Sequence, residues 1–277
     1  MTRLEEWFKT RDRVLVMGVL NVTPDSFYDG GRYGHFDAAV ARGLQMVEEG
    51  ADIIDVGGES SRPGTTSVSL DEELERAIPV IRRLRQESDV LLSIDTTKAA
   101  VAEEALAAGA SIINDISALR FDEKMVEISA KRGAFIILMH MLGTPETMQR
   151  SPHYTDVVAE IMTFLSERIA TAIRGGVPRQ RILIDPGIGF GKRVEDNLAI
   201  LRNLAQFKDL GGPLVVGLSR KSFLGQILDA PVEERLVGTI AANAIAVING
   251  ADVIRVHDVK QGRQTADLAY RLRQDEH

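Results

Sequence analysis

Polar and charged side chains stand directly after short apolar runs along the whole chain. In order they are Asn21, Asp55, Asp95, Asn114 with Asp115, His140, Asp185, Ser219, and Arg255 with His257. Such groups hydrogen-bond polar ligands, and the carboxylates and the guanidinium also carry charge. Loops are polar in most proteins, so chance supplies some of these residues. A polar residue after nearly every run still favours a shared binding site.

The apolar runs have the length and composition of β-strands. They cover residues 13–20, 52–56, 90–94, 111–114, 135–139, 181–185, 213–217 and 252–256. They are apolar throughout, which is typical of strands buried on both faces. Helical periodicity lies between them, for example at 37–49, 70–86, 99–108, 194–204 and 233–248. Eight strand–helix units predict an α/β fold, the closed (β/α)8 TIM barrel, with an open doubly wound sheet as the alternative.

In a barrel of this kind the chemistry lies at the C-terminal ends of the strands, where the polar residues would meet. Two connections at these ends, Asn21–Gly31 and Gly57–Ser67, are long and rich in glycine. Loops of that length are usually functional or disordered. Because both mix glycine with proline and polar donors, we interpret them as lids that close over a substrate.

Composition limits the class of protein. The chain has 277 residues, near the typical length of about 250 for such a barrel, and no linker divides it, so we expect a single domain over 1–277 with a core at roughly 14–272. The net charge of −7 and the lack of a basic block disfavour nucleic acid as a partner. There are no cysteines, and neither a signal peptide nor a membrane span is evident. We expect a cytoplasmic protein without a membrane partner.

Two patterns that suggest other chemistry fail on inspection. The segment 187–192 follows a strand and has three glycines and a lysine, but it matches neither the Walker phosphate loop nor the dinucleotide-binding pattern. The five histidines show no metalloprotease spacing. The sequence therefore gives no support for nucleotide binding or zinc catalysis.

Eight motifs near the strand ends carry a resemblance to a known family. They are Met17–Phe27, Gly57–Gly64, Ile94–Thr96, Ile113–Asp115, Leu138–Met141, Asp185–Gly187, Ser219–Ser222 and Arg255–Val259. Their order and content resemble dihydropteroate synthase over about 14–259. The resemblance implies a TIM barrel that binds a pterin, and an attack by the amine of p-aminobenzoate that displaces pyrophosphate. It also implies Mg²⁺ as cofactor and a homodimer.

Two alternatives stay open from the sequence. Related barrels bind reduced pterins and transfer a methyl group to a corrinoid, and a non-catalytic pterin-binding paralogue would keep the same ligands. The loop with Arg62 and the pair Arg255 and His257 favour the synthase. Ser61, Tyr28 and Leu142 depart from the family's usual residues, and we expect these changes to affect inhibitor response and rate but not the reaction.

The resemblance assigns the pterin site to residues at the strand ends. A carboxylate matches the guanidine-like edge of a pterin with two parallel hydrogen bonds, and we expect Asp185 to supply it. Asp95 and Asn114 would satisfy the other ring atoms, although strand-end Asp and Asn residues often cap helices instead. Lys221 would donate to the pterin carbonyl. Met139 and Phe190 would line the flat walls, and Arg255 would complete the site.

The remaining assignments concern pyrophosphate and p-aminobenzoate. Pyrophosphate would be met by Asn21, Ser61, Arg255 and His257, with Asn21 as the ligand of Mg²⁺. Ser61, Arg62 and Ser219 would receive p-aminobenzoate. We expect the catalytic residues to be Asn21, Lys221, Arg255 and His257. No residue stands out as a base, which favours dissociative loss of pyrophosphate with electrostatic stabilisation of the leaving group.

Overall fold

The computed structural model describes residues 3–23, 31–60, 64–65, 67–274 of the chain. Tyr28, Ser61 and Arg62, which the sequence analysis singled out, lie outside the described residues. Their predicted roles therefore rest on the sequence.

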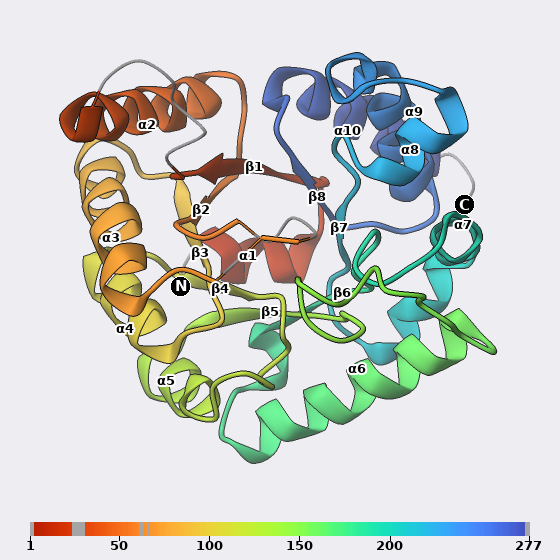
Figure 1. Cartoon of the computed structure of the whole chain (residues 1–277), viewed down its shortest axis with the longest axis horizontal. Helices are drawn as coiled ribbons and strands as arrows, with labels where there is room; N and C mark the ends of the chain where they lie inside the picture. The colour runs from red at the N-terminus through yellow and green to blue at the C-terminus, as the bar shows by residue number, and fades with distance from the viewer. Residues whose placement is uncertain (1–2, 24–30, 61–63, 66, 275–277) are drawn as a thin grey trace.

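Eight parallel strands form the centre of the molecule (Figure 1). They are β1 (Leu15–Asn21), β2 (Ile53–Gly57), β3 (Leu91–Asp95), β4 (Ile112–Asp115), β5 (Phe135–Met139), β6 (Ile182–Asp185), β7 (Val215–Gly217) and β8 (Val253–Val256). Strands from β1 to β6 pair in sequence order, and β8 joins β1 to β7. A bridge between Ile184 and Leu214 brings β6 beside the start of β7. The sheet thus closes on itself, so the barrel prediction is confirmed and an open doubly wound sheet is excluded.

A helix follows every strand and covers the outside of the barrel (Figure 1). These helices are α2 (Gly31–Glu48), α3 (Leu70–Glu87), α4 (Ala99–Ala108), α5 (Lys124–Arg132), α6 (Val157–Arg174), α7 (Val194–Arg202), α8 (Ser222–Leu228) with α9 (Leu236–Ile248), and α10 (Val259–Gln274). Short 3-10 turns lie at Arg179–Arg181, Leu204–Leu210 and Val232–Glu234. Within the described part of the chain, no helix is long and apolar enough to cross a membrane.

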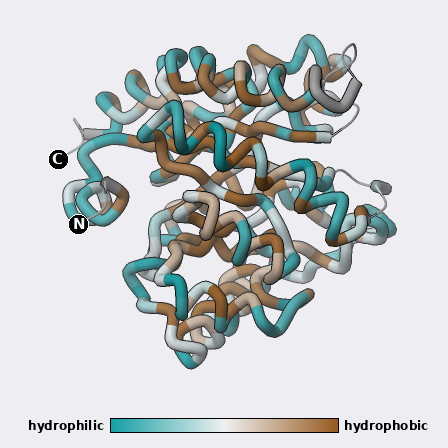
Figure 2. Tube along the Cα trace, turned by 90° about the vertical axis from the view of Figure 1, so that its left-hand side faces the viewer, coloured by the Kyte–Doolittle hydropathy of each residue, from teal (hydrophilic) through white to brown (hydrophobic). Residues whose placement is uncertain are grey.

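The strands are buried on both faces because they separate two apolar layers. The larger layer fills the space between strands and helices, and a smaller one fills the barrel interior near the strand starts. Figure 2 shows the hydrophobic residues running through the middle of the molecule, with many hydrophilic residues on the outer helices. Burial of this kind is the main stabilising contribution to such a fold. It also leaves the polar strand ends as the part of the barrel that can bind a ligand.

The opposite end of the barrel is closed by a helix that the sequence analysis did not predict. Helix α1 (Arg3–Thr10) lies behind the strands in the view of Figure 1. Its Leu4, Trp7 and Phe8 pack against residues from the strand starts, including Phe135. The Trp7 Nε1 donates to the carbonyl of Arg13 at 2.8 Å, which fixes the turn into β1. With this end filled by side chains, a ligand reaches the interior only from the C-terminal ends of the strands.

Candidate active site

The C-terminal ends of the strands bring the predicted residues to one mouth of the barrel. Asn21, Asp95, Met139 and Asp185 are the last residues of β1, β3, β5 and β6. The other members are Asn114 in β4, Arg255 in β8, Ser219 just beyond β7 and His257 just beyond β8. Asp95, Asn114, Asp185 and Ser219 are buried, as expected for groups inside the mouth.

Arg255 joins three strands through its guanidinium. Its Nε donates to Asp55 Oδ2 at 2.7 Å and its Nη2 donates to Asp95 Oδ2 at 2.6 Å. Asn114 Nδ2 also donates to Asp55 Oδ2, at 2.9 Å. Asp55, which has no exposed surface, therefore joins Arg255 to Asn114, and Arg255 in turn holds Asp95. Asp55 was expected at a strand end but without a role, and its place among the other strand-end polar residues is the signal in the sequence that points to it.

The charges in this network alter its acid–base behaviour. Burial raises the pKa of Asp95 from 3.8 to about 7; Arg255 lowers it, and the Asp55 carboxylate raises it further. Burial lowers the pKa of Arg255, but the attraction of Asp55 and Asp95 outweighs this and raises that pKa above its ordinary value. Arg255 therefore stays charged, while the protonation of Asp95 changes near neutral pH.

Two of these residues already have protein partners, which bears on their predicted roles. The Asp95 carboxylate was expected to be free for a ligand, but it accepts from Arg255. It does not cap helix α4, since Thr96 Oγ1 accepts from the Lys98 N–H at 3.1 Å and Asp122 Oδ2 accepts from the Ala99 N–H at 2.8 Å. Arg255 was expected to face pyrophosphate with His257, but its described partners are carboxylates. An anion at Arg255 would have to share the guanidinium with those carboxylates.

Asp185 lies at the end of β6, where the next turn holds it in place. Its Oδ1 accepts from the Gly187 N–H at 2.7 Å. Burial raises the pKa of Asp185, and the Gly187 N–H and the nearby cations, Lys221 first among them, lower it. Burial has the larger effect, so the pKa of Asp185 lies above its ordinary value, and the carboxyl group is a buried acceptor beside positive charge.

Lys221 turns inward although it precedes helix α8, where a cation is disfavoured by the helix dipole. Its Nζ donates to the Ile188 carbonyl and lies 4.4 Å from the centre of the Phe190 ring. Burial lowers the pKa of Lys221 to about 8, and Asp185 acts in the opposite direction. Lys221, Phe190 and Asp185 therefore form one side of the mouth.

Met139 and Phe190 belong to a small apolar cluster at the same end of the barrel. Met139 is buried with Ile116, Met141 and Met148, and Phe190 packs against them partly exposed. Polarisable methionine sulfur and an aromatic face suit the flat surface of a conjugated ring. The cluster lies apart from the two larger apolar layers, which is consistent with a separate ligand slot.

Ser219 and His257 form a direct pair. Ser219 Oγ is 2.9 Å from His257 Nδ1 and accepts from the His257 backbone N–H at 3.2 Å. The next residues are also joined, because the Arg220 guanidinium makes two hydrogen bonds of 3.0 Å to Asp258. Ser219 and His257 were assigned to different substrates, and the structure places them together.

Asn21 presents an amide oxygen of the kind that Mg²⁺ prefers. Gly57 separates it from Asp95: a side-chain carbon on Gly57 would lie 3.6 Å from Asn21 Oδ1 and 3.5 Å from Asp95 Cβ. Within the part of the chain that the structure describes, no group of three His, Cys, Asp or Glu side chains is arranged to hold a metal ion. The donors fit Mg²⁺ only if water and a phosphate supply most of its ligands.

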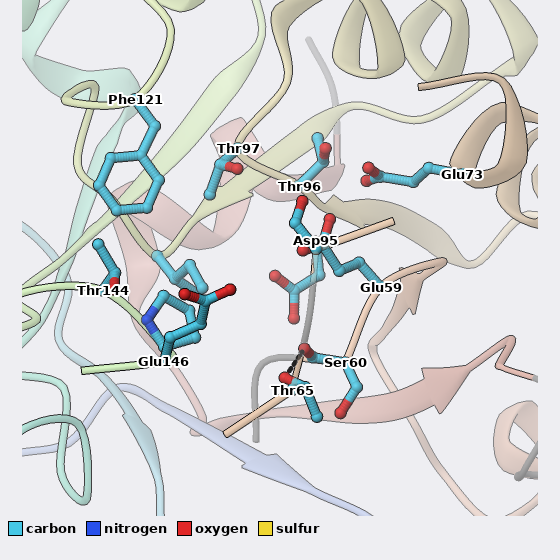
Figure 3. Close-up of a pocket in the computed structure, with 13 residues that line it drawn as sticks. Glu59, Ser60, Thr65, Glu73, Asp95, Thr96, Thr97, Phe121, Thr144 and Glu146 are labelled. Atoms are coloured by element: carbon cyan, nitrogen blue, oxygen red, sulfur yellow. Dashed lines mark hydrogen bonds between the residues drawn. The ribbon is translucent and has the colours of Figure 1, made fainter. Parts of the chain in front are cut away.

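A cavity of about 280 Å³ opens beside Asp95 (Figure 3). Figure 3 shows Asp95 between Glu59, Ser60 and Thr65 on one side and Thr144 and Glu146 on the other. Its lining carries four carboxylates and several hydroxyls, and no lysine or arginine among the described residues. The described walls therefore do not attract an anion, so pyrophosphate and a benzoate carboxylate need cations from elsewhere.

Two strand-end polar residues serve the local fold instead of the mouth. Asp115 accepts from the N–H and hydroxyl of Ser117 and from the Leu119 N–H, which uses both of its oxygens. His140 contacts the buried amine of Lys192. The polar residues at the strand ends are therefore partly ligand-facing and partly structural, and type and position alone do not separate them.

Comparison with known proteins defines the class to which this barrel and site belong. Residues 17–257, most of the chain, match the family described as pterin binding enzyme. The matched region spans every strand end described above. The fold and site are those of a pterin-binding barrel enzyme.

Individual relatives show which pterin-binding enzymes this chain resembles. The chain is 49% identical to dihydropteroate synthase of Synechocystis over 96% of its length and 91% of the relative. Two solved structures of Xanthomonas albilineans dihydropteroate synthase are similar. The first, with 4-aminobenzoic acid, is 46% identical and has a TM-score of 0.89. The match covers 95% of this chain and 94% of that chain. The other, with 7,8-dihydropteroate, is 43% identical with a TM-score of 0.86 and 95% coverage of each chain. The chain belongs to the dihydropteroate synthase family, whose members are transferases.

Proposed function

We propose that the chain joins 6-hydroxymethyl-7,8-dihydropterin pyrophosphate to p-aminobenzoate, giving 7,8-dihydropteroate and pyrophosphate, through the residues gathered at its strand ends. Family membership supports the reaction, and the Xanthomonas relatives bind 4-aminobenzoic acid and 7,8-dihydropteroate. The observation that carries the residue assignment is the buried Asp185 carboxylate, held by Gly187 beside Lys221 and Phe190.

Asp185 would accept two hydrogen bonds from the guanidine-like edge of the pterin. One of its oxygens already accepts from Gly187, so the carboxylate is oriented before the ligand arrives. Lys221 would donate to the pterin carbonyl, and Met139 and Phe190 would cover the ring faces. Asn114 and Asp95, fixed by Asp55 and Arg255, would meet the remaining ring atoms. Preorganised groups of this kind lower the entropic cost of binding.

The reaction forms a bond between the amine nitrogen of p-aminobenzoate and the exocyclic methylene carbon of the pterin. The bond from that carbon to pyrophosphate breaks, and pyrophosphate leaves with the electron pair. The amine nitrogen loses one proton to water or to the released anion. The role of the protein is to hold the two reactants and to stabilise the charge on the leaving group through Arg255, His257 and Lys221.

Mg²⁺, when bound, would neutralise part of the pyrophosphate charge. Asn21 is the residue of this chain that would hold it, through its amide oxygen at the end of β1. The Asp95 carboxylate lies across Gly57 from Asn21, and negative charge there favours a cation between the chain and the phosphate groups.

p-Aminobenzoate would be received by Ser61 and Arg62 from the second long loop, and by Ser219. Arg62 is the natural partner for the benzoate carboxylate because its guanidinium can donate two parallel hydrogen bonds. The acidic described walls of the cavity beside Asp95 make such a cation necessary, since they offer no lysine or arginine of their own among the described residues.

Assembly as a homodimer is part of the proposal. Helices α9 and α10 pack together and expose Val237, Ile245, Ile248, Leu268 and Leu272. Several exposed large apolar side chains on two packed helices are typical of an interface, and a second copy of the chain is the occupant we propose. We further propose that the protein acts in the cytoplasm on small-molecule substrates, without nucleic acid as a partner.

A turnover assay tests the proposed reaction. The protein is mixed with 6-hydroxymethyl-7,8-dihydropterin pyrophosphate, p-aminobenzoate and Mg²⁺, and the product is identified by mass spectrometry. We expect dihydropteroate in an amount that depends on all three additions. No product above a protein-free control would contradict the proposal.

A further inference from the structure

The segment 187–192 resembles a phosphate loop in sequence, but its lysine points into the protein. Lys192 is only 3% exposed. Its Nζ lies 2.9 Å from His140 Nδ1 and donates to the Phe190 carbonyl at 3.0 Å. An unpaired amine in such a position would be costly, so these two contacts are what makes its burial possible.

His140 is the neutral partner in this contact. Burial first, and then the charges of Lys192 and Arg120, lower the pKa of His140 to about 2. The neutral ring offers Nδ1 as an acceptor. It packs at nearly a right angle against the Phe164 ring, with 4.9 Å between the two ring centroids. Burial and the nearby Lys221 also lower the pKa of Lys192. In either charge state the amine carries the two protons that its contacts to His140 and Phe190 require.

The Lys192–His140 pair lies directly behind two residues of the pterin site. The His140 backbone N–H donates to the Asp185 carbonyl at 3.0 Å. A side-chain carbon on Gly187 would lie 1.8 Å from the His140 carbonyl oxygen, so Gly187 fits against His140 only because it has no side chain. Gly187 in turn holds the Asp185 carboxylate. The pair therefore touches both the residue that orients Asp185 and the backbone of Phe190.

We propose that Lys192 and His140 are positioning residues that fix the place of Phe190 relative to the Asp185 carboxylate, and hence the fit of the pterin between its edge contact and its ring wall. Neither residue touches the ligand. Lys192 donates a hydrogen bond to the Phe190 carbonyl, and His140, just after β5, accepts a second one from the same amine. This inference rests on the proposed function, because the ligand whose fit is set is a pterin.

The test uses a pair of His140 variants that differ in one acceptor. In His140→Asn the amide oxygen occupies the place of Nδ1, whereas His140→Leu has similar size without an acceptor. We expect His140→Leu and Lys192→Met each to weaken binding of 6-hydroxymethyl-7,8-dihydropterin by about tenfold, the effect of losing one buried hydrogen bond. His140→Asn should stay within about threefold of wild type. The double variant should be no weaker than either single variant, since the two residues act as a unit.

Gln149→Ala is the matched control, because Gln149 donates to the Gly189 carbonyl of the same segment at 2.8 Å from the exposed side. It should leave pterin affinity unchanged. Lower thermal stability with unchanged pterin affinity in Lys192→Met and His140→Leu would overturn the inference, as would equal losses in both His140 variants. If Lys192→Met does not fold, the pterin affinities of the two His140 variants still test the proposal. Absence of pterin binding by the wild type would instead contradict the proposed function.

Discussion

Arg255 Nε donates to Asp55 Oδ2 at 2.7 Å and so ties the last strand of the barrel to the second. Asp95 takes a second N–H of the same guanidinium. Two carboxylates thus share one cation, which leaves a negative charge at the mouth when both are ionised. An arriving pyrophosphate meets this charge, and its binding depends on how Asp55 and Asp95 are compensated.

Replacing Asp55 by Asn removes the charge while keeping the shape. We expect pyrophosphate to bind several-fold more tightly, because Arg255 keeps a neutral acceptor and its charge is less compensated. The free energy of unfolding should fall by about 1–3 kcal/mol, since the buried hydrogen bond to Arg255 loses its anionic acceptor. Calorimetry and chemical denaturation measure the two effects.

Glu103→Gln is the control for this change, because Glu103 pairs with Arg132 on the surface, where ion pairs contribute little. It should alter neither quantity. If Asp55→Asn behaved like Glu103→Gln, the charge balance at Arg255 would not govern anion binding.

The pKa of Asp95 predicts a pH effect on stability. Because burial raises this pKa from 3.8 to about 7, the folded protein keeps a proton that the unfolded chain releases in that range. The stabilising contribution of Asp95 is therefore fully present below about pH 4 and is lost as the pH rises through about 7. Asp95→Asn lacks this dependence.

Chemical denaturation of both proteins between about pH 5 and about pH 8 measures it. The unfolding free energy of the wild type should decline relative to that of Asp95→Asn as the pH rises, and the difference should level off above about pH 8. A wild-type unfolding free energy that stays constant relative to that of Asp95→Asn over this range would show that Asp95 ionises at its ordinary pKa, and one that rises relative to the variant would equally contradict the prediction.

Arg62→Ala separates the two substrates. We expect the KM for p-aminobenzoate to rise by about tenfold or more, since a charge-assisted bidentate contact is lost. Pterin affinity should hold, because the pterin residues come from the strand ends. Steady-state kinetics measure the KM for p-aminobenzoate, and a calorimetric titration measures the affinity for the pterin. Weaker pterin binding with an unchanged KM would mean that this loop closes over the pterin instead.

The sequence predicted the strands well because burial on both faces leaves a strong signal. Every predicted strand agrees with the structure within two residues at either end. Helix α1 was not predicted, because its apolar Leu4, Trp7 and Phe8 stand in a short, charged segment. What shows them to be core residues is contact with the strand starts, which lie far away in the sequence.

The site was predicted less completely for a related reason. Residue type and strand-end position gave Asp95, Asn114, Asp185 and Arg255, but not the pairing of Arg255 with Asp55. That pairing joins residues at opposite ends of the sequence, and only closure of the barrel brings them together. Lys192 was likewise set aside with its glycine-rich segment, since the sequence does not show that its amine turns toward His140.

The most direct test of the account is a calorimetric titration of 6-hydroxymethyl-7,8-dihydropterin into the wild type and into Asp185→Asn. The amide keeps the size of the carboxylate but turns one acceptor into a donor that faces the donors of the pterin. Leaving such buried groups unpaired costs about 1–3 kcal/mol or more, so affinity should fall at least about tenfold while the protein stays folded. Equal affinity in the two proteins would contradict the assignment of Asp185 and, with it, the placement of the pterin at the end of β6.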